Sequence, residues 1–119
     1  VLLPGARADA LKFVRAFDVF VMPSLSEGLP LALLEAMSGE VPVIASDIPA
    51  MAPIIKGAGG TAVRVGDVGG LTKALVEHFE LPGTALRERG LCAFGYLQAH
   101  HSVGQYRSQY LALVEGCPR

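Results

Sequence analysis

The fold is decided by residues 18–46, which read DVFVMPSLSEGLPLALLEAMSGEVPVIAS. The continuous apolar run at 18–22 is typical of a strand that is buried on both faces, and residues 42–45 form a second run of this kind. Good helix formers fill residues 31–38 between the two runs. A strand, a helix and a second strand in this order predict a βαβ unit, and hence a parallel sheet covered by helices.

The same alternation continues on both sides of this unit. Upstream, residues 1–3 are apolar and end at Pro4–Gly5, which predicts a strand and a turn, and residues 9–17 predict a helix. Downstream we expect one more strand, at 61–65, and four helices, at 49–57, 69–79, 85–99 and 103–114. Because no strand is expected after Val65, the sequence predicts one Rossmann-like α/β sheet with helices on both faces.

Two of the downstream helices carry recognisable start signals. Asp67 precedes the helix expected at 69–79, and Ser102 precedes the helix expected at 103–114. Their side-chain oxygens can accept hydrogen bonds from the unpaired amides of a first turn, so we expect both residues to be N-caps.

Composition limits the classes of partner. The chain has 119 residues, which corresponds to one domain or to part of a larger one, and 51% of them are hydrophobic. This apolar share is high enough to leave surface for another part of a protein. Lys and Arg total 10 and Asp and Glu total 11, so no basic excess favours binding to nucleic acid.

Cysteine use and hydropathy argue against a metal site, a secretion signal and a membrane span. Cys92 and Cys117 lie 25 positions apart, without the Cys-x-x-Cys or Cys/His spacing of a metal site. We therefore expect two free thiols in a reducing cytoplasm. No apolar run reaches the length of a membrane span, and residues 1–10 do not resemble a signal peptide. The chain lacks a starting Met, which favours a fragment or a processed product.

The loop at residues 23–30 is the best candidate for chemistry. In open parallel sheets, ligands bind beyond the carboxyl ends of the strands, and this loop leads from such an end into a helix. Gly28 allows a ligand to approach the backbone closely or allows a positive φ. Pro30 suits a first helical turn, which would leave the amides of Leu31 and Ala32 free. Free amides at the positive end of a helix predict a phosphate site.

Two carboxylates bracket this helix start. Glu27 lies in the loop, and Glu35 lies eight positions later in the helix. Carboxylates accept hydrogen bonds from sugar hydroxyls, so two of them around a phosphate site match the layout of a nucleoside diphosphate sugar. Taken singly, Glu27 could be a capping residue and Glu35 a solvated helix residue; their shared context favours a ligand site.

The segment from Ser24 to Met37 resembles the Glu-x7-Glu motif of family-4 type retaining glycosyltransferases with the GT-B fold. Its flanks at 18–24, 41–50 and 65–67, together with Ser102 and Tyr110, agree with the family's pattern. The resemblance implies that residues 1–119 are part of the C-terminal nucleotide-sugar-binding lobe, truncated at its N-terminal side, with a closing helix at 101–119. The acceptor-binding lobe and the basic diphosphate ligands would lie upstream, so we expect this fragment alone to be inactive.

The resemblance also implies roles for individual residues. Glu27 would be catalytic, contacting the transferred sugar and stabilising charge at its reacting carbon, and Glu35 would hold the ribose hydroxyls. The other donor contacts are implied for the sugar at Gly28 and Leu29, for the diphosphate at Leu31 and Ala32, and for the base near Gly5. The donor would be a UDP-sugar or GDP-sugar, with no cofactor and no obligatory metal.

Two positions depart from the family's pattern. The family usually has Gly-x-Pro after the motif helix, whereas here Glu40 takes the place of that Gly and Gly39 comes one position earlier. A Glu in a left-handed conformation costs about 1 kcal/mol, so we expect the helix to end one residue early, at Gly39. Pro53 stands where the family often has Glu.

The full-length protein is thus expected to transfer a hexosyl group, with retention, to a glycan, lipid or other acceptor. The cytoplasm is its expected location, and association with a membrane surface stays open. The last helix, residues 103–114, is expected to expose an apolar strip toward the absent lobe. Two other classes also stay open at this point, namely a non-catalytic nucleotide-binding module and a protein-interaction module.

Overall fold

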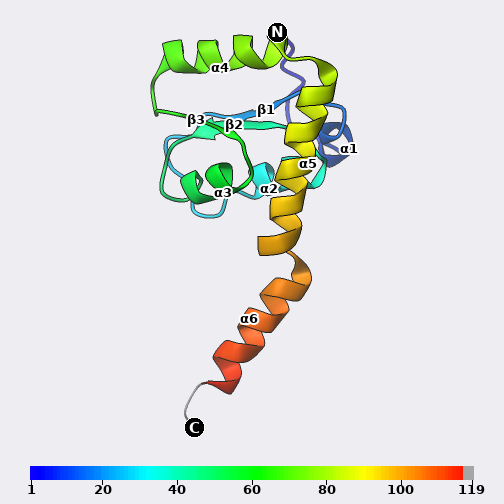
Figure 1. Cartoon of the computed structure of the whole chain (residues 1–119), viewed down its shortest axis with the longest axis vertical. Helices are drawn as coiled ribbons and strands as arrows, with labels where there is room; N and C mark the ends of the chain where they lie inside the picture. Colours follow the sequence, from blue (N-terminus) through cyan, green and yellow to red (C-terminus); the bar gives the residue numbers. More distant parts are fainter. Residues whose placement is uncertain (117–119) are drawn as a thin grey trace.

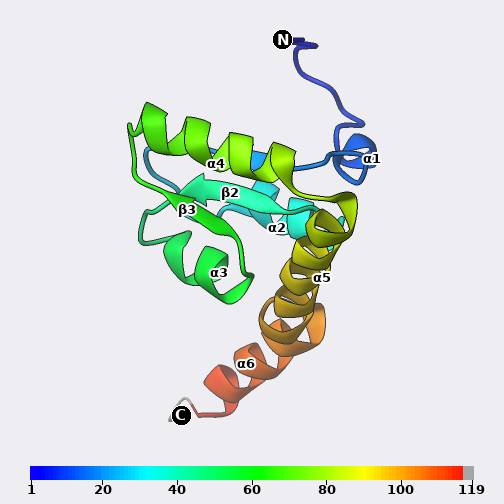
Figure 2. The same cartoon turned by 45° about the horizontal axis from the view of Figure 1, so that its top comes forward.

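The computed structural model describes residues 1–116 and has three layers (Figure 1). The middle layer is a parallel sheet in the order β1-β2-β3, formed by β1 (Phe20–Met22), β2 (Val43–Ser46) and β3 (Thr61–Val63). The helices α2 (Leu31–Ser38) and α3 (Ala52–Gly57) lie on one face, and α4 (Val68–Glu80) lies on the other (Figure 2). The predicted Rossmann-like α/β class, with helices on both faces, is confirmed.

Three helices lie outside this sandwich. The short α1 (Leu11–Val14) and the long α5 (Gly83–His100) both pack against α2. The last helix, α6 (Val103–Glu115), projects away from the body, which makes the molecule 56 Å long but only 30 Å wide (Figure 1). Its side chains Val103, Tyr106, Tyr110 and Leu113 are exposed at helical spacing, as expected of an apolar strip, and the direction of this strip toward another lobe stays a prediction.

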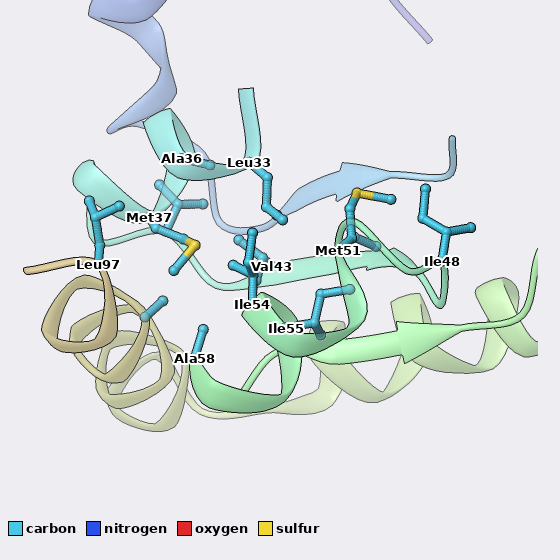
Figure 3. Packing of buried hydrophobic residues seen from close by; sticks show 13 residues of the cluster. Leu33, Ala36, Met37, Val43, Ile48, Met51, Ile54, Ile55, Ala58 and Leu97 are labelled. Atoms are coloured by element: carbon cyan, nitrogen blue, oxygen red, sulfur yellow. The ribbon is translucent and has the colours of Figure 1, made fainter. Parts of the chain in front are cut away.

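The core lies between the sheet and the helices α2 and α3, which cover one of its faces. All four residues of β2 are buried, and side chains from α2, α3 and α5 converge on this strand (Figure 3). Leu33, Met37 and Ile55 are among the largest side chains of this core, and each is at most 1% exposed. The middle strand therefore behaves as its apolar run predicts.

The prediction that β1 is buried on both faces is wrong. Its three residues are only partly buried, because β1 is an edge strand in the sheet that residues 1–116 form. The strand predicted at residues 1–3 is also absent from the described structure. Val1, Leu2 and Leu3 are at least 91% exposed, and no neighbouring strand pairs with them.

Both predicted N-caps are confirmed. The Asp67 carboxylate accepts a hydrogen bond from the Gly70 amide (2.8 Å) at the start of α4. The Ser102 hydroxyl accepts one from the Gln105 amide (3.2 Å) at the start of α6. These contacts depend on residues three positions apart, which explains why the sequence suffices to predict them.

The carboxyl end of α2 partly corrects the prediction made for Glu40. The helix does end at Ser38 with Gly39 as its cap, but Glu40 takes the left-handed conformation that it was expected to avoid (φ 60°). Its N–H donates to the Met37 carbonyl (3.1 Å), and the Val41 N–H donates to the Ala36 carbonyl (3.2 Å). This is a Schellman motif with Glu40 where Gly is usual, and buried Val41 holds it in place.

The His78 side chain joins the last turn of α4 to α5. It is 3% exposed. Its Nε2 lies 3.1 Å from the Arg89 guanidinium, which can only donate, so Nε2 accepts and Nδ1 donates to the Ala74 carbonyl (2.8 Å). A pattern of residue types does not reveal such a contact, because Arg89 lies eleven residues away on another helix.

Candidate functional site

The candidate site lies at the carboxyl edge of the sheet, where the 23–30 loop leads from β1 into α2. Because the strands are parallel, the turns that follow β2 and β3 reach the same edge. On the α4 side, a mostly apolar cavity of about 190 Å³ opens here, lined by Val21, Leu25, Ser46 and Arg64 among others. The sequence analysis does not single out Arg64, because only its position directly after β3 places it at this edge.

The start of α2 differs from the prediction in one respect. Pro30 is the N-cap and not a residue of the first turn, and its dihedral angles (φ −79°, ψ 69°) are those of an inverse γ-turn. In this turn the Leu31 N–H donates to the Leu29 carbonyl (2.8 Å), so the Leu31 amide is already bonded. Among residues 1–116, the Ala32 amide has no backbone partner, as predicted. One of the two expected free amides therefore remains.

The two motif carboxylates are unpaired in the part of the chain that the structure describes. Glu27 is half-buried and Glu35 is exposed, and neither side chain takes part in a hydrogen bond or ion pair there. No side chain caps α2, which removes the interpretation of Glu27 as its capping residue. Both carboxylates are thus free to accept hydrogen bonds from a ligand.

The backbone of the loop is open to solvent. A Cβ added to Gly28 would meet nothing within 4 Å, and its φ is not positive. Of the two reasons considered for this glycine, close approach of a ligand is the one compatible with the structure. The side chains of Leu29 and Leu31 are exposed beside it, by 62% and 58%.

Gly5 is not brought together with these residues. It lies in the segment before α1, with φ +73°, and lines a separate cavity with Arg7, Phe13 and Phe17. Figure 2 shows this segment running away from the sheet. Its place near the base of a donor stays a prediction.

Three further features concern metals, thiols and membranes. In residues 1–116, no group of three or more His, Cys, Asp or Glu side chains is placed to hold a metal ion, and metal independence stays a prediction. Cys92 is a free, exposed thiol, whereas Cys117 lies outside the described residues. Within the same range, no helix is long and apolar enough to cross a membrane.

Comparison with known proteins identifies the family. Residues 1–80 match the family model of group 1 glycosyl transferases. The chain is 42% identical over 77 residues to a UDP-Gal:α-D-GlcNAc-diphosphoundecaprenol α-1,3-galactosyltransferase of Escherichia coli, covering 64% of this chain and 20% of that protein. It is 34% identical over 87 residues to the lipopolysaccharide core biosynthesis mannosyltransferase LpcC of Rhizobium leguminosarum bv. viciae, covering 72% of this chain and 25% of that protein.

The chain thus spans no more than about a quarter of the length of these two relatives. The family match covers the sheet, the 23–30 loop, the helix that carries Glu35, and α4. Because it also covers well over half of the chain, the assignment does not depend on the motif alone. The chain belongs to the group 1 glycosyltransferase family.

Proposed function

We propose that this chain forms the nucleotide-sugar-binding part of a retaining glycosyltransferase with the GT-B fold. The donor is a UDP-sugar or GDP-sugar, and a hexosyl group passes to a glycan, lipid or other acceptor. Relatives named for galactosyl and mannosyl transfer support a hexosyl donor. One of them is named for a diphosphoundecaprenol acceptor, and an acceptor of that kind would bring the full-length enzyme to a membrane surface.

The observation that carries this proposal is the open amino end of α2. An unbonded Ala32 amide, the positive end of the helix dipole and an uncovered Gly28 lie at the carboxyl edge of a parallel sheet. A helix start of this kind attracts the negative charge of a diphosphate. Glu27 and Glu35 then supply acceptors for hydroxyl groups on either side of it.

The roles divide according to what each residue would contact. Glu35 accepts hydrogen bonds from the ribose, which every donor nucleotide has. Glu27 accepts them from the transferred sugar and stabilises the positive charge that develops at its reacting carbon. The backbone at Gly28 and Leu29 contacts the sugar. The diphosphate is assigned to Ala32, with the Leu31 amide contributing only if its bond to Leu29 opens.

The other parts of the enzyme belong to the same proposal. Residues 1–119 would work with an acceptor-binding lobe elsewhere in the full-length protein, which is consistent with the small share of each relative that the chain covers. The exposed strip of α6, formed by Val103, Tyr106, Tyr110 and Leu113, is the surface expected to face that lobe. Residues 1–119 alone are expected to lack transferase activity.

Calorimetry with UDP and GDP on the full-length protein tests this function. Glu35→Ala should weaken binding of the preferred nucleotide by at least about tenfold, since a hydrogen bond to a charged group contributes roughly 1.5–3 kcal/mol. Glu27→Ala should leave binding of the free nucleotide close to wild type, because no sugar is present for Glu27 to contact.

The matched control is Glu88→Ala, which removes an exposed helix carboxylate in α5, remote from the 23–30 loop. It should bind nucleotide as the wild type does. Equal losses for Glu27→Ala and Glu35→Ala, or no nucleotide binding by the wild-type protein, would contradict the assignment of these residues.

A further inference from the structure

The cavity on the α4 side of the carboxyl edge has a largely apolar wall. Its volume is about 190 Å³, and strands and α4 contribute the side chains of Val21, Ile44, Val63 and Leu71. An apolar cavity of about 150 Å³ binds benzene, whereas pockets for drug-sized ligands start at roughly 300 Å³. This cavity therefore has room for one substituent of a ligand but not for a whole nucleotide sugar.

One polar side chain is buried in this wall. Val43 and Ala45 belong to the core on the α2 side, and because side chains alternate along a strand, Ser46 faces α4 and lines the cavity. Ser46 is only 3% exposed, and its hydroxyl takes part in no hydrogen bond within residues 1–116. In that range, no buried side-chain oxygen is both unpartnered and closed off from solvent. The small exposed part of Ser46 thus includes its Oγ, which is open to the cavity.

Two exposed, charged side chains of opposite sign also line the cavity. Arg64 lies directly after β3, and Asp67 is the N-cap of α4. Neither takes part in an ion pair in the part of the chain that the structure describes. An arginine only donates hydrogen bonds, and a carboxylate only accepts them. The lining therefore favours a neutral group that has an acceptor, a donor and an apolar part.

The 23–30 loop connects this cavity with the candidate donor site. Leu25 lines the cavity, and Glu27, two residues later, is the carboxylate proposed to contact the transferred sugar. A sugar held by this loop would have its substituents close to the cavity. The sugar substituent that combines a hydrogen-bond acceptor, a donor and a methyl group without a charge is the acetamido group.

We propose that the cavity binds the acetamido group of an N-acetylated amino sugar. The carbonyl oxygen would accept hydrogen bonds from Ser46 and Arg64, the N–H would donate to Asp67, and the methyl group would contact the apolar wall. A plain hexose has a hydroxyl group at this position and would leave the wall unfilled. The inference rests on the proposed function, which brings a sugar to the 23–30 loop, and either the donor or the acceptor sugar supplies the group.

Calorimetry on the full-length protein tests the donor as the source. One matched pair is UDP-N-acetylglucosamine and UDP-glucose, and the other is UDP-N-acetylgalactosamine and UDP-galactose. The wild type should bind the N-acetylated member of one pair at least about tenfold more tightly. Ser46→Ala and Arg64→Ala should each reduce this preference to about threefold or less, while unchanged binding of free UDP shows that both variants are folded.

The matched control is Thr72→Ala. It removes an exposed hydroxyl of α4 that donates to the Val68 carbonyl within the same helix (2.8 Å). Thr72→Ala should therefore keep the full preference for the N-acetylated sugar. The acceptor is tested as the source by the same comparison with methyl N-acetyl-α-glucosaminide and methyl α-glucoside, in the presence of saturating UDP or GDP.

Two results would overturn the proposal while the proposed function stands. Nucleotide could bind without a preference for the N-acetylated compound in any of the three pairs, or the preference could persist in both Ser46→Ala and Arg64→Ala. A wild-type protein that binds neither UDP nor GDP would instead contradict the proposed function, and the inference would fail with it.

Discussion

The two ends of α2 differ in almost every physical respect. At the amino end, the Ala32 amide lacks a backbone partner in the described chain, Gly28 faces open space, and Glu27 is unpaired. At the carboxyl end, the Glu40 and Val41 amides are both bonded. A Cβ on Gly90 of α5 would overlap the Glu40 carbonyl oxygen, so the two backbones are in direct contact.

This difference separates stability from binding along one helix of eight residues. Its buried face, with Leu33, Ala36 and Met37, and its closed carboxyl end hold it in the fold. The amino end is anchored by buried Pro30, yet it leaves the Ala32 amide and the Glu27 carboxylate open to a ligand. Substitutions at the two ends should affect different measurements.

The largest effect is expected at the closed end. Gly90→Ala would place a methyl group against the Glu40 carbonyl, and because backbone cannot move as a flexible side chain does, we expect a loss of about 3 kcal/mol in the free energy of unfolding. Urea denaturation measures this loss. The control is Gly95→Ala in the same helix, where a Cβ would meet nothing within 4 Å, and it should stabilise the protein by about 1 kcal/mol. If both variants unfold alike, α5 does not pack closely on this turn.

The next effect concerns the open end and should appear in binding alone. A Cβ on Gly28 has free space, so Gly28→Ala should change the free energy of unfolding by less than about 0.5 kcal/mol. If a donor approaches this backbone closely, the added methyl group should weaken nucleotide-sugar binding about tenfold, equivalent to 1.4 kcal/mol. Calorimetry and urea denaturation on the same preparation distinguish the two. A marked loss of stability would show that Gly28 has a structural role.

The smallest effect tests strain at the closed end. Glu40→Gly should raise the free energy of unfolding by about 1 kcal/mol, because glycine adopts a φ of 60° without the Cβ penalty. Glu40→Ala retains that penalty and removes the charge, so it should show no such gain. If the two variants gain equally, the charge of Glu40 and not its backbone conformation is responsible.

Predictions that depend on neighbours in the sequence agree best with the structure. The helix expected at 31–38 has these bounds, and Asp67 and Ser102 cap the helices expected after them. Periodicity and capping act within one or two turns of chain, so the sequence alone contains them. The middle strand is buried as its apolar run predicts, because β2 has a neighbour on each side.

The predictions that were wrong depend on distant parts of the chain. The left-handed Glu40 is held by buried Val41 and by contact with α5. The incomplete burial of β1 likewise follows from its position at an edge of the described sheet. For the candidate site, the motif identifies Glu27 and Glu35 from the sequence, but their roles toward a donor stay predictions until a ligand is bound.

The γ-turn at Pro30 also determines the side of α2 on which an anion can bind. Because this turn occupies the Leu31 N–H, the first free N–H group that α2 offers to solvent is one residue further along, at Ala32. Successive residues of an α-helix are rotated by about 100° around its axis. An anion at this end would therefore be held more than a quarter of a circle away from the direction of the Leu31 amide. The turn at Pro30 would thereby set the side of α2 on which the anion lies.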